Sequence, residues 1–318
     1  FKGALLGAGA SVMGIGSDMA GSIRLPAFLN GVFGHKSTPG KLIYNVFFQI
    51  ILTIGQITKY AEDLSLLMKV MTPKRNHDLR LDVPVDFRQI KIYYREDLDT
   101  MFGVLPMPPK IVECIQWAAN HFVRYDIPVK KVRVMFQLTR FRDGKQYMLQ
   151  NCAVNFDINF LLPQGKPTVE LMKALFGLSQ YTKQMLTFAV SFQPNFPFMK
   201  SKISYYSKQT DELRQKLLDL LGDDGVLIYP TFRNPFLPQL LLCELLTFSS
   251  CSLFNIFVCR VTHVPMGLAH EGMPVGAQII AASYQNRLCL AVAKEQKKTF
   301  GGWVPPSIDD KVSEGLCK

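Results

Sequence analysis

The residue best placed to act as a nucleophile is Ser22, which follows Gly21 and stands two positions before Arg24 in a segment crowded with small residues. Glycine lets the backbone turn sharply or approach a ligand closely. A hydroxyl on such a turn is held outward, beside main-chain N–H groups that can point at one spot. These are the minimum parts of a serine nucleophile beside an oxyanion hole. Glycine-rich loops also serve tight packing, so the pattern by itself leaves both interpretations open.

Two phosphate-binding loops compete for the same part of the chain. The sequence GAG at 7–9 begins like a dinucleotide fingerprint, but Val12 stands where that motif requires its third glycine. The sequence GHKS at 34–37 is similar to the end of a Walker loop, with His35 inserted between the glycine and Lys36. The insertion would move the lysine away from the phosphates. Both spacings argue against a nucleotide-binding protein.

Longer motifs in this segment resemble a known family. The stretches GIGSDMAGSIRLPA at 14–27 and GVFGHKSTPG at 31–40 are similar to the amidase signature. The resemblance implies an acyl-enzyme on Ser22 that water then hydrolyses. It also implies an oxyanion hole made of main-chain N–H groups, those of Met19, Ala20, Gly21 and Ser22.

Three further residues receive supporting roles from this resemblance. Ser17 stands where the family has a hydroxyl residue that supports a second serine. Asp18 and Arg24 are expected to pair beside the turn and to fix its shape. An ordinary surface ion pair would stabilise the protein little, and we favour the supporting role.

The chain departs from the family pattern at the groups that activate the nucleophile. The family uses a second serine and a neutral lysine, in segments that would precede Phe1 and Lys2. We therefore expect residues 1–318 to form a single amidase domain that lacks its N-terminal part, with the signature at 3–40. Lys36 is a poor substitute because it belongs to the later signature segment. A serine without its base is barely nucleophilic, so a catalytically silent relative that binds lipids or partners stands as the alternative.

Three other positions differ from the family. Ala20 replaces a glycine, and alanine costs about 1 kcal/mol where the backbone needs a positive φ. Val258 and Arg260 stand where a glycine and a proline are usual.

Segments beyond the signature are similar to the fatty-acid amide hydrolase branch of the family. They occur in family order at 60–64, 177–182, 222–226, 229–230, 274–279 and 290–303. This resemblance implies fatty-acid amide substrates and an apolar tunnel for the acyl chain. The candidate tunnel regions are the Phe-rich stretch at 188–198 and the run around Phe248, Leu253, Phe254 and Phe257, although most apolar residues are core.

Composition narrows the classes of partner. The 318 residues are 48% hydrophobic and 19% charged, which predicts a sizeable core and excludes global disorder. The formal net charge of +11 favours anionic surfaces. Lysine and arginine are scattered and no nucleic-acid motif occurs, so we expect no nucleic-acid partner. The expected partners are a lipid amide substrate and a membrane surface, at an intracellular and membrane-associated location, with homodimer formation left open.

The cysteines and histidines indicate neither a metal nor a cofactor. Seven cysteines, an odd number, occur without a C-x-x-C spacing, which favours reduced, mostly buried thiols in an intracellular setting. His263 and His270 match no zinc motif, and the resemblance implies no histidine in the chemistry. We therefore expect structural histidines.

Hydrophobic periodicity predicts the elements that position these residues. Helices are expected at 60–71, 111–125, 168–178, 201–221 and 286–298, and strands at 90–94, 129–136, 226–230 and 274–280. The apolar run at 42–58 indicates a buried strand or a loop–strand pair. The run at 235–259 is near the length of a membrane span, but its interruptions favour a core or lipid-facing segment. Helices that alternate with buried strands predict an α/β architecture. The resemblance implies an amidase-signature fold, with a central mixed β-sheet covered by helices on both faces.

Overall fold

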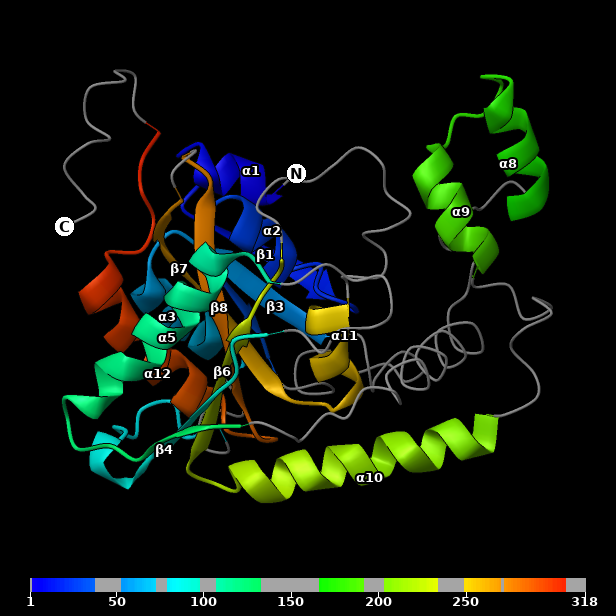
Figure 1. Ribbon diagram of the computed structural model, residues 1–318. Helices are drawn as coiled ribbons and strands as arrows, with labels where there is room; N and C mark the ends of the chain where they lie inside the picture. The colour runs from blue at the N-terminus through cyan, green and yellow to red at the C-terminus, as the bar shows by residue number, and fades with distance from the viewer. Residues whose placement is uncertain are drawn as a thin grey trace.

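The computed structural model describes residues 2–37, 53–72, 79–97, 107–132, 166–191, 203–233, 249–269 and 272–306. Within these residues eight strands form one sheet in the order β1-β3-β2-β7-β8-β6-β4-β5 (Figure 1). The strands are β1 (Met13–Asp18), β2 (Phe33–Lys36), β3 (Thr53–Thr58), β4 (Lys91–Tyr94), β5 (Val129–Lys131), β6 (Gly225–Pro230), β7 (Arg260–Leu268) and β8 (Pro274–Ala281).

The sheet is mixed. From β1 through β3, β2, β7 and β8 to β6, each strand runs antiparallel to its neighbour. Strand β4 then pairs in parallel with both β6 and β5. The mixed sheet predicted from the resemblance is confirmed.

The helices connect and cover these strands. Those in the described ranges are α1 (Lys2–Gly7), α2 (Arg24–Leu29), α3 (Ala61–Met71), α5 (Pro109–Val123), α8 (Pro167–Leu175), α9 (Lys183–Ser191), α10 (Ile203–Leu221), α11 (Ser249–Ile256) and α12 (Asn286–Phe300), together with the 3₁₀ helix η2 (Phe87–Gln89).

Alternate side chains of the central strands face two hydrophobic layers. Val226 and Ile228 of β6 lie in the core that contains residues of α2, α3, α5 and α12. Leu227 and Tyr229 of the same strand lie in the core that contains residues of α10 and α11. Successive residues of a strand point to opposite faces of a sheet. Helices therefore cover both faces, as predicted (Figure 1).

Most predicted elements are present close to their predicted positions. The five predicted helices correspond to α3, α5, α8, α10 and α12, and four predicted strands correspond to β4, β5, β6 and β8. The run at 42–58 ends in β3, while its first part, 42–52, lies outside the described residues. Strand β5 is described only to residue 132, so the remainder of the predicted strand at 129–136 also lies outside them.

Some elements have no counterpart among the predictions. Strands β1, β2 and β7 mix glycine, histidine, lysine or proline with apolar residues, which weakens the alternation that marks a strand. The first part of the Phe-rich stretch at 188–198 is helical, because residues 183–191 form α9. Leu186 and Ala189 of α9 are buried together with Ala174 of α8, and this pairing of helices is a tertiary contact.

The described part of the run at 235–259 is core. Leu253, Phe254 and Phe257 are buried against residues of α10 and the sheet, where they pack the interior. Phe248, His270 and the stretch at 192–198 lie outside the described residues. Among the described helices, none has the length and apolar character needed to cross a membrane.

Four cysteines in the described ranges are free and buried, as the sequence predicted. Burial raises the pKa of each thiol, to about 11 for Cys251 and Cys259 and to about 12 for Cys114 and Cys289.

Candidate active site

The turn that carries Ser22 joins the end of β1 to the start of α2. Strand β1 ends at Asp18 and α2 begins at Arg24, so the turn occupies only the residues between them. The Ser22 side chain is exposed, whereas Gly21 and Ile23 on either side are buried. The N–H of Leu25 donates to the carbonyl oxygen of Gly21 at 2.8 Å, which starts the first helical turn directly behind the hydroxyl.

Gly21 is required by both its conformation and its surroundings. Its φ of +115° lies in the region that L-amino acids with a Cβ rarely adopt. A Cβ added there would stand 2.5 Å from Cβ of Cys251, a residue of α11. The turn can therefore take this shape against α11 only with glycine at this position.

The carboxylate of Asp18 organises the main chain of the turn. Its Oδ1 accepts the N–H of Gly21 at 2.7 Å, and its Oδ2 accepts the N–H of Ile23 at 3.2 Å. These two N–H groups flank Ser22. One side chain thus fixes the backbone on both sides of the candidate nucleophile.

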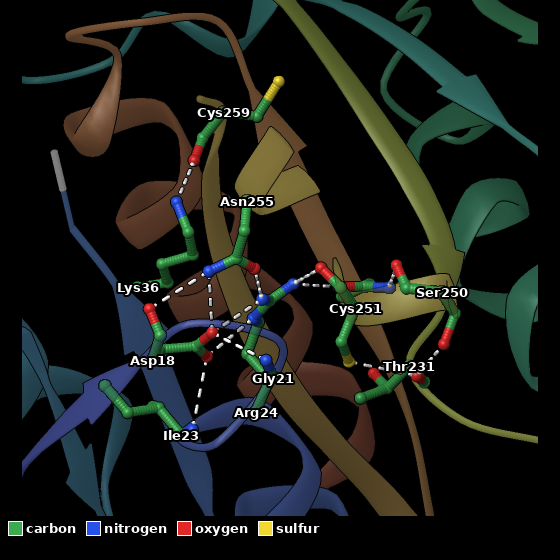
Figure 2. Close-up of polar contacts among 11 residues, drawn as sticks. Asp18, Gly21, Ile23, Arg24, Lys36, Thr231, Ser250, Cys251, Asn255 and Cys259 are labelled. Atoms are coloured by element: carbon green, nitrogen blue, oxygen red, sulfur yellow. Dashed lines mark hydrogen bonds and ion pairs between the residues drawn. The ribbon is translucent and has the colours of Figure 1, made fainter. Parts of the chain in front are cut away.

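Arg24 neutralises this carboxylate in the interior. Its Nη2 lies 2.9 Å from Oδ1 of Asp18 and its Nε donates to Oδ2 at 3.0 Å, with both side chains 0% exposed (Figure 2). The expected pair is present, and it is buried rather than at the surface. Burial by itself would raise the pKa of Asp18, but Arg24 outweighs it and holds that pKa well below its ordinary value. The carboxylate is therefore ionised near neutral pH.

Helix α11 supplies further partners for the same ion pair. Asn255 donates from Nδ2 to both O and Oδ1 of Asp18 at 3.0 Å, and its Oδ1 accepts from Nη2 of Arg24 (Figure 2). Arg24 also donates from Nη1 to the carbonyl oxygen of Cys251 at 2.9 Å and to Oε1 of Gln278 at 3.1 Å.

The network continues beneath α11. Gln278 of β8 donates to the carbonyl oxygens of Pro230 at 2.9 Å and Ser250 at 3.1 Å. The hydroxyl of Ser250 donates to the carbonyl oxygen of Thr231 at 2.7 Å. Asn255 and Gln278 were not among the predicted site residues. Each is a polar residue within a mainly apolar stretch, which is the one sequence signal that could have identified it. The same signal fits a simple interruption of an apolar segment.

The expected oxyanion donors differ in availability. The N–H of Gly21 already donates to Asp18, so the expectation that it is free is corrected: the carboxylate that shapes the turn takes this donor. Among the described residues, no hydrogen bond from the N–H groups of Met19, Ala20 or Ser22 is found. Ala20 does not adopt a positive φ, so the strain expected at this substitution does not arise.

Ser17 lies on the exposed side of β1. It pairs with Ile54 of β3 and precedes Asp18, whose side chain is buried. Because side chains alternate along a strand, Ser17 points to the opposite face from Asp18. Its hydroxyl is therefore exposed.

Lys36 lies deep in the fold. It is the last residue of β2, is 0% exposed, and its Nζ donates to the carbonyl oxygen of Cys259 at 2.8 Å. Burial, together with the positive charges of Arg260 and Arg24, lowers the pKa of Lys36 to about 7.

The buried histidines are structural. The ring of His35 forms a hydrogen bond between Nδ1 and Oγ1 of Thr262 at 2.8 Å and another between Nε2 and Oδ1 of Asn286 at 3.2 Å. His263 contacts Oγ1 of Thr231 through Nδ1 at 2.8 Å. Burial lowers the pKa of both rings to about 3, so they are neutral near pH 7. No group of potential metal ligands was found in the part of the chain that the structure describes.

Comparison with known proteins gives the same family that the turn suggests. The amidase family model matches residues 2–101. The chain is 33% identical to fatty-acid amide hydrolase 2 of Homo sapiens, over 96% of this chain and 60% of that protein. The fold is similar to 6-aminohexanoate cyclic dimer hydrolase, with a TM-score of 0.71 and 18% identity over 94% of this chain and 66% of that one. It is also similar to peptide amidase from Stenotrophomonas maltophilia, with a TM-score of 0.67 and 17% identity over 96% of this chain and 66% of that one.

The fold, a mixed sheet with helices on both faces, is thus shared with solved structures of a hydrolase and of a peptide amidase. The predicted resemblance to the amidase signature family is confirmed by the family model over residues 2–101 and by 33% identity to fatty-acid amide hydrolase 2 of Homo sapiens along 96% of this chain. It spans about 60% of the length of the curated relatives named fatty-acid amide hydrolase 2 that it matches.

Proposed function

We propose that the protein hydrolyses carboxylic amides through an acyl-enzyme on Ser22. The observation that carries the proposal is an exposed Ser22 on a turn whose flanking N–H groups are both held by the buried Asp18 carboxylate. A nucleophile needs a fixed position near the carbonyl carbon, and preorganisation of this kind supplies it. Similarity to the amidase family supports the reaction class.

The proposed reaction has two halves. Oγ of Ser22 gives its proton to a base and forms a bond to the amide carbon, while the carbonyl oxygen becomes an oxyanion. The N–H groups of Met19, Ala20 and Ser22, which donate no hydrogen bond found within the described part of the chain, are the candidate donors to that oxyanion, and losing one such donor costs about 3 kcal/mol of barrier. The C–N bond then breaks, the amine leaves with a proton, and water hydrolyses the ester to restore Ser22.

The base is not found among the described residues at the turn. Asp18 and Arg24 are committed to each other, and Lys36 is buried against the carbonyl oxygen of Cys259. The resemblance assigns the base to a second serine and a lysine that match no residue of this chain. Activity is therefore to be tested in the complete protein.

The test is labelling of the complete protein with a fluorophosphonate probe for active-site serines. We expect labelling of the parent and none of the Ser22→Ala variant. Ser11→Ala is the matched control, because Ser11 precedes β1 and has no assigned role at the site, and this variant keeps its label on Ser22. Equal labelling of Ser22→Ala and the parent would remove Ser22 from the chemistry. A protein that takes no label and turns over no amide, but binds lipid, would be the silent relative.

We propose fatty-acid amides as the substrate class. Support comes from similarity to fatty-acid amide hydrolase 2 of two species along 96% of this chain. The assay compares a long-chain fatty amide with acetamide, and we expect kcat/KM to favour the long chain by about 100-fold or more, because each buried CH₂ contributes about 0.8 kcal/mol. Equal kcat/KM values for the two amides would argue against fatty-acid amides as the substrate class.

We also propose that the helix pair α8–α9 docks on an anionic membrane surface. Five apolar side chains at this pair are between about half and three-quarters exposed: Val169, Met172, Leu175, Phe176 and Leu178. Lys166, Lys173 and Lys183 are exposed beside them. Apolar side chains rimmed by lysine suit the interface of an anionic bilayer. The net charge of +11 acts in the same direction.

Co-sedimentation with vesicles tests this surface. We expect binding to vesicles that contain phosphatidylserine, and a bound fraction about tenfold lower for the double variant Met172→Ser with Phe176→Ser. Leu66→Ser with Val70→Ser is the matched control, because both residues are similarly exposed but lie on α3. An equal loss in both double variants would argue against a role for α8–α9. Homodimer formation stays a prediction.

A further inference from the structure

We infer that Asn255 of α11 is a positioning residue for the Ser22 nucleophile, an inference that rests on the proposed function of Ser22. Asn255 does not reach the reacting atoms, because it lies 0% exposed on the inner side of the turn. It acts through Asp18, the carboxylate that holds the main chain on both sides of Ser22.

The amide of Asn255 matches its two charged neighbours. Its Nδ2 group donates to Oδ1 and to the main-chain oxygen of Asp18, both at 3.0 Å, and its Oδ1 accepts from Arg24 (Figure 2). An amide offers donors at one end and an acceptor at the other. A single neutral side chain therefore gives a donor to the anion and an acceptor to the cation, and adds no charge to the interior.

The hydrogen bond from Asn255 to the main-chain oxygen of Asp18 makes a second contribution to the position of the turn. It binds the last residue of β1, directly before the turn begins. Together with the bond to Oδ1, it fixes both the backbone and the carboxylate orientation of Asp18. The N–H groups of Gly21 and Ile23 then have defined acceptors, and Ser22 between them has a defined position.

Helix α11 also contacts the turn through Cys251. Cys251, one helical turn before Asn255, gives its carbonyl oxygen to Arg24 and packs its Cβ where a side chain on Gly21 would stand. Positioning of Ser22 is thus shared between α11 and the turn itself. Asn255 is the member of α11 that binds both halves of the ion pair.

Neither isosteric replacement of Asn255 satisfies this site. Leucine would leave the Arg24 donor and the Asp18 acceptors without their partner in a buried setting. Aspartate would place a second carboxylate against Asp18. The charged groups that face this position are Asp18 from β1, Arg24 from α2 and Lys36 from β2. Two carboxylates in contact share a proton at low pH and repel each other once both are ionised.

The experiment measures the second-order rate of Ser22 labelling by a fluorophosphonate in the complete protein, from about pH 6 to about pH 9. For Asn255→Ala we expect labelling about 100-fold slower than in the parent at every pH, the scale of a misplacement by about 1 Å. For Asn255→Asp we expect a similar deficit at high pH. That deficit should shrink at least about tenfold toward low pH, because the shared proton restores a donor to Asp18.

The matched control is Asn30→Asp. Asn30 also donates from Nδ2 to a carbonyl oxygen, that of Pro26, and it lies at the end of α2 without contact to Asp18. We expect parent-like labelling at every pH. If Asn255→Asp does not fold, Asn255→Ser is measured instead, with its thermal unfolding as a check, and it should label slowly while folded.

The outcomes separate the two proposals. Loss of label in Ser22→Ala with parent-like rates in the folded Asn255 variants would overturn the positioning role and leave the proposed function intact. A deficit in Asn255→Asp that does not change with pH would also overturn it, since a merely structural defect has no reason to follow one proton. Undiminished labelling of Ser22→Ala would defeat the proposed function, and this inference with it.

Discussion

At the scale of single residues, the candidate site depends on a charge pair that the solvent does not reach. The carboxylate of Asp18 accepts from the main chain, from the guanidinium of Arg24 and from the amide of Asn255. Removing two charges from water is expensive, and their attraction offsets that expense only when the remaining donors and acceptors are satisfied. Here they are satisfied by residues from β1, α2, α11 and β8, which explains why a charged pair is tolerated under the turn.

The first prediction concerns the fork shape of the guanidinium. In Arg24→Lys, one ammonium group replaces three nitrogens that reach Asp18, Cys251, Gln278 and Asn255, so buried acceptors lose their donors. We expect the free energy of unfolding to fall by about 3 kcal/mol, measured by urea denaturation.

Arg88→Lys is the control for this change. Arg88 pairs with Asp86 at 3.1 Å, but its side chain is 86% exposed, so the same substitution should change stability by less than about 0.5 kcal/mol. Equal effects at the two positions would mean that the burial of Arg24 does not determine its contribution.

At the scale of elements, the turn from α11 into β7 carries a residue in a strained conformation. Val258 has a φ of +57°, the left-handed region in which a β-branched residue is a rare exception. The family usually has glycine at this position, and the structure shows why glycine suits it. The carbonyl oxygen of Val258 accepts from Arg260 at 2.9 Å and from Ser283 at 3.3 Å, so the turn keeps this shape in spite of the strain.

The second prediction isolates that strain. We expect Val258→Gly to be more stable than Val258→Ala by about 1 kcal/mol, because both variants lose the valine side chain but only glycine escapes the clash of Cβ. Thermal unfolding of the two proteins measures the difference. Identical unfolding temperatures would mean that the turn relaxes in solution.

At the scale of the whole molecule, the sheet encloses several titratable groups in one interior. His35, Lys36 and His263 are all 0% exposed, on strands β2 and β7 that pair with each other. Burial disfavours the charged form of each group. The stability of the whole fold therefore depends on pH through residues that take no part in the proposed chemistry.

The third prediction gives the sign of that dependence. Burial lowers the pKa of His35 and His263 from 6.5 to about 3, so the unfolded chain binds more protons between these values, and stability falls as the pH falls through this window. Burial lowers the pKa of Lys36 from 10.5 to about 7, so stability rises between about pH 7 and pH 10.5. Urea denaturation across pH measures both effects.

Two variants assign these effects to residues. His35→Gln should lose less stability in acid than the parent, and Lys36→Met should show a flatter profile on the alkaline side by a few kcal/mol, about the scale of a three-unit shift. If a variant keeps the parent's dependence of unfolding free energy on pH in the pH range assigned to its residue, that residue is not the titrating group.

Much of the architecture could be predicted from local patterns. The helix at 60–71 has a hydrophobic periodicity that matches its burial, and it is present as α3. The strand at 226–230 has an unbroken apolar run that matches its full burial, and it is present as β6. Strand β7 could not be predicted in this way. It runs through the middle of the sheet and is buried along most of its length, so its polar residues do not alternate with apolar ones. Thr262 forms a hydrogen bond with His35 of β2, and Pro265 lies beside an irregularity in the pairing with β8.

The sequence by itself determined the turn. Asp18, Gly21, Ser22 and Arg24 lie within seven positions of one another, and such short spacings constrain the backbone directly. Only the tertiary structure decided that the Asp18–Arg24 pair is buried, that it takes up the N–H of Gly21, and that Asn255 and Gln278 complete it. These two partners stand 231 and 254 positions from Arg24. Contacts of that separation exist only after the strands have taken their places in the sheet, and no local spacing encodes them.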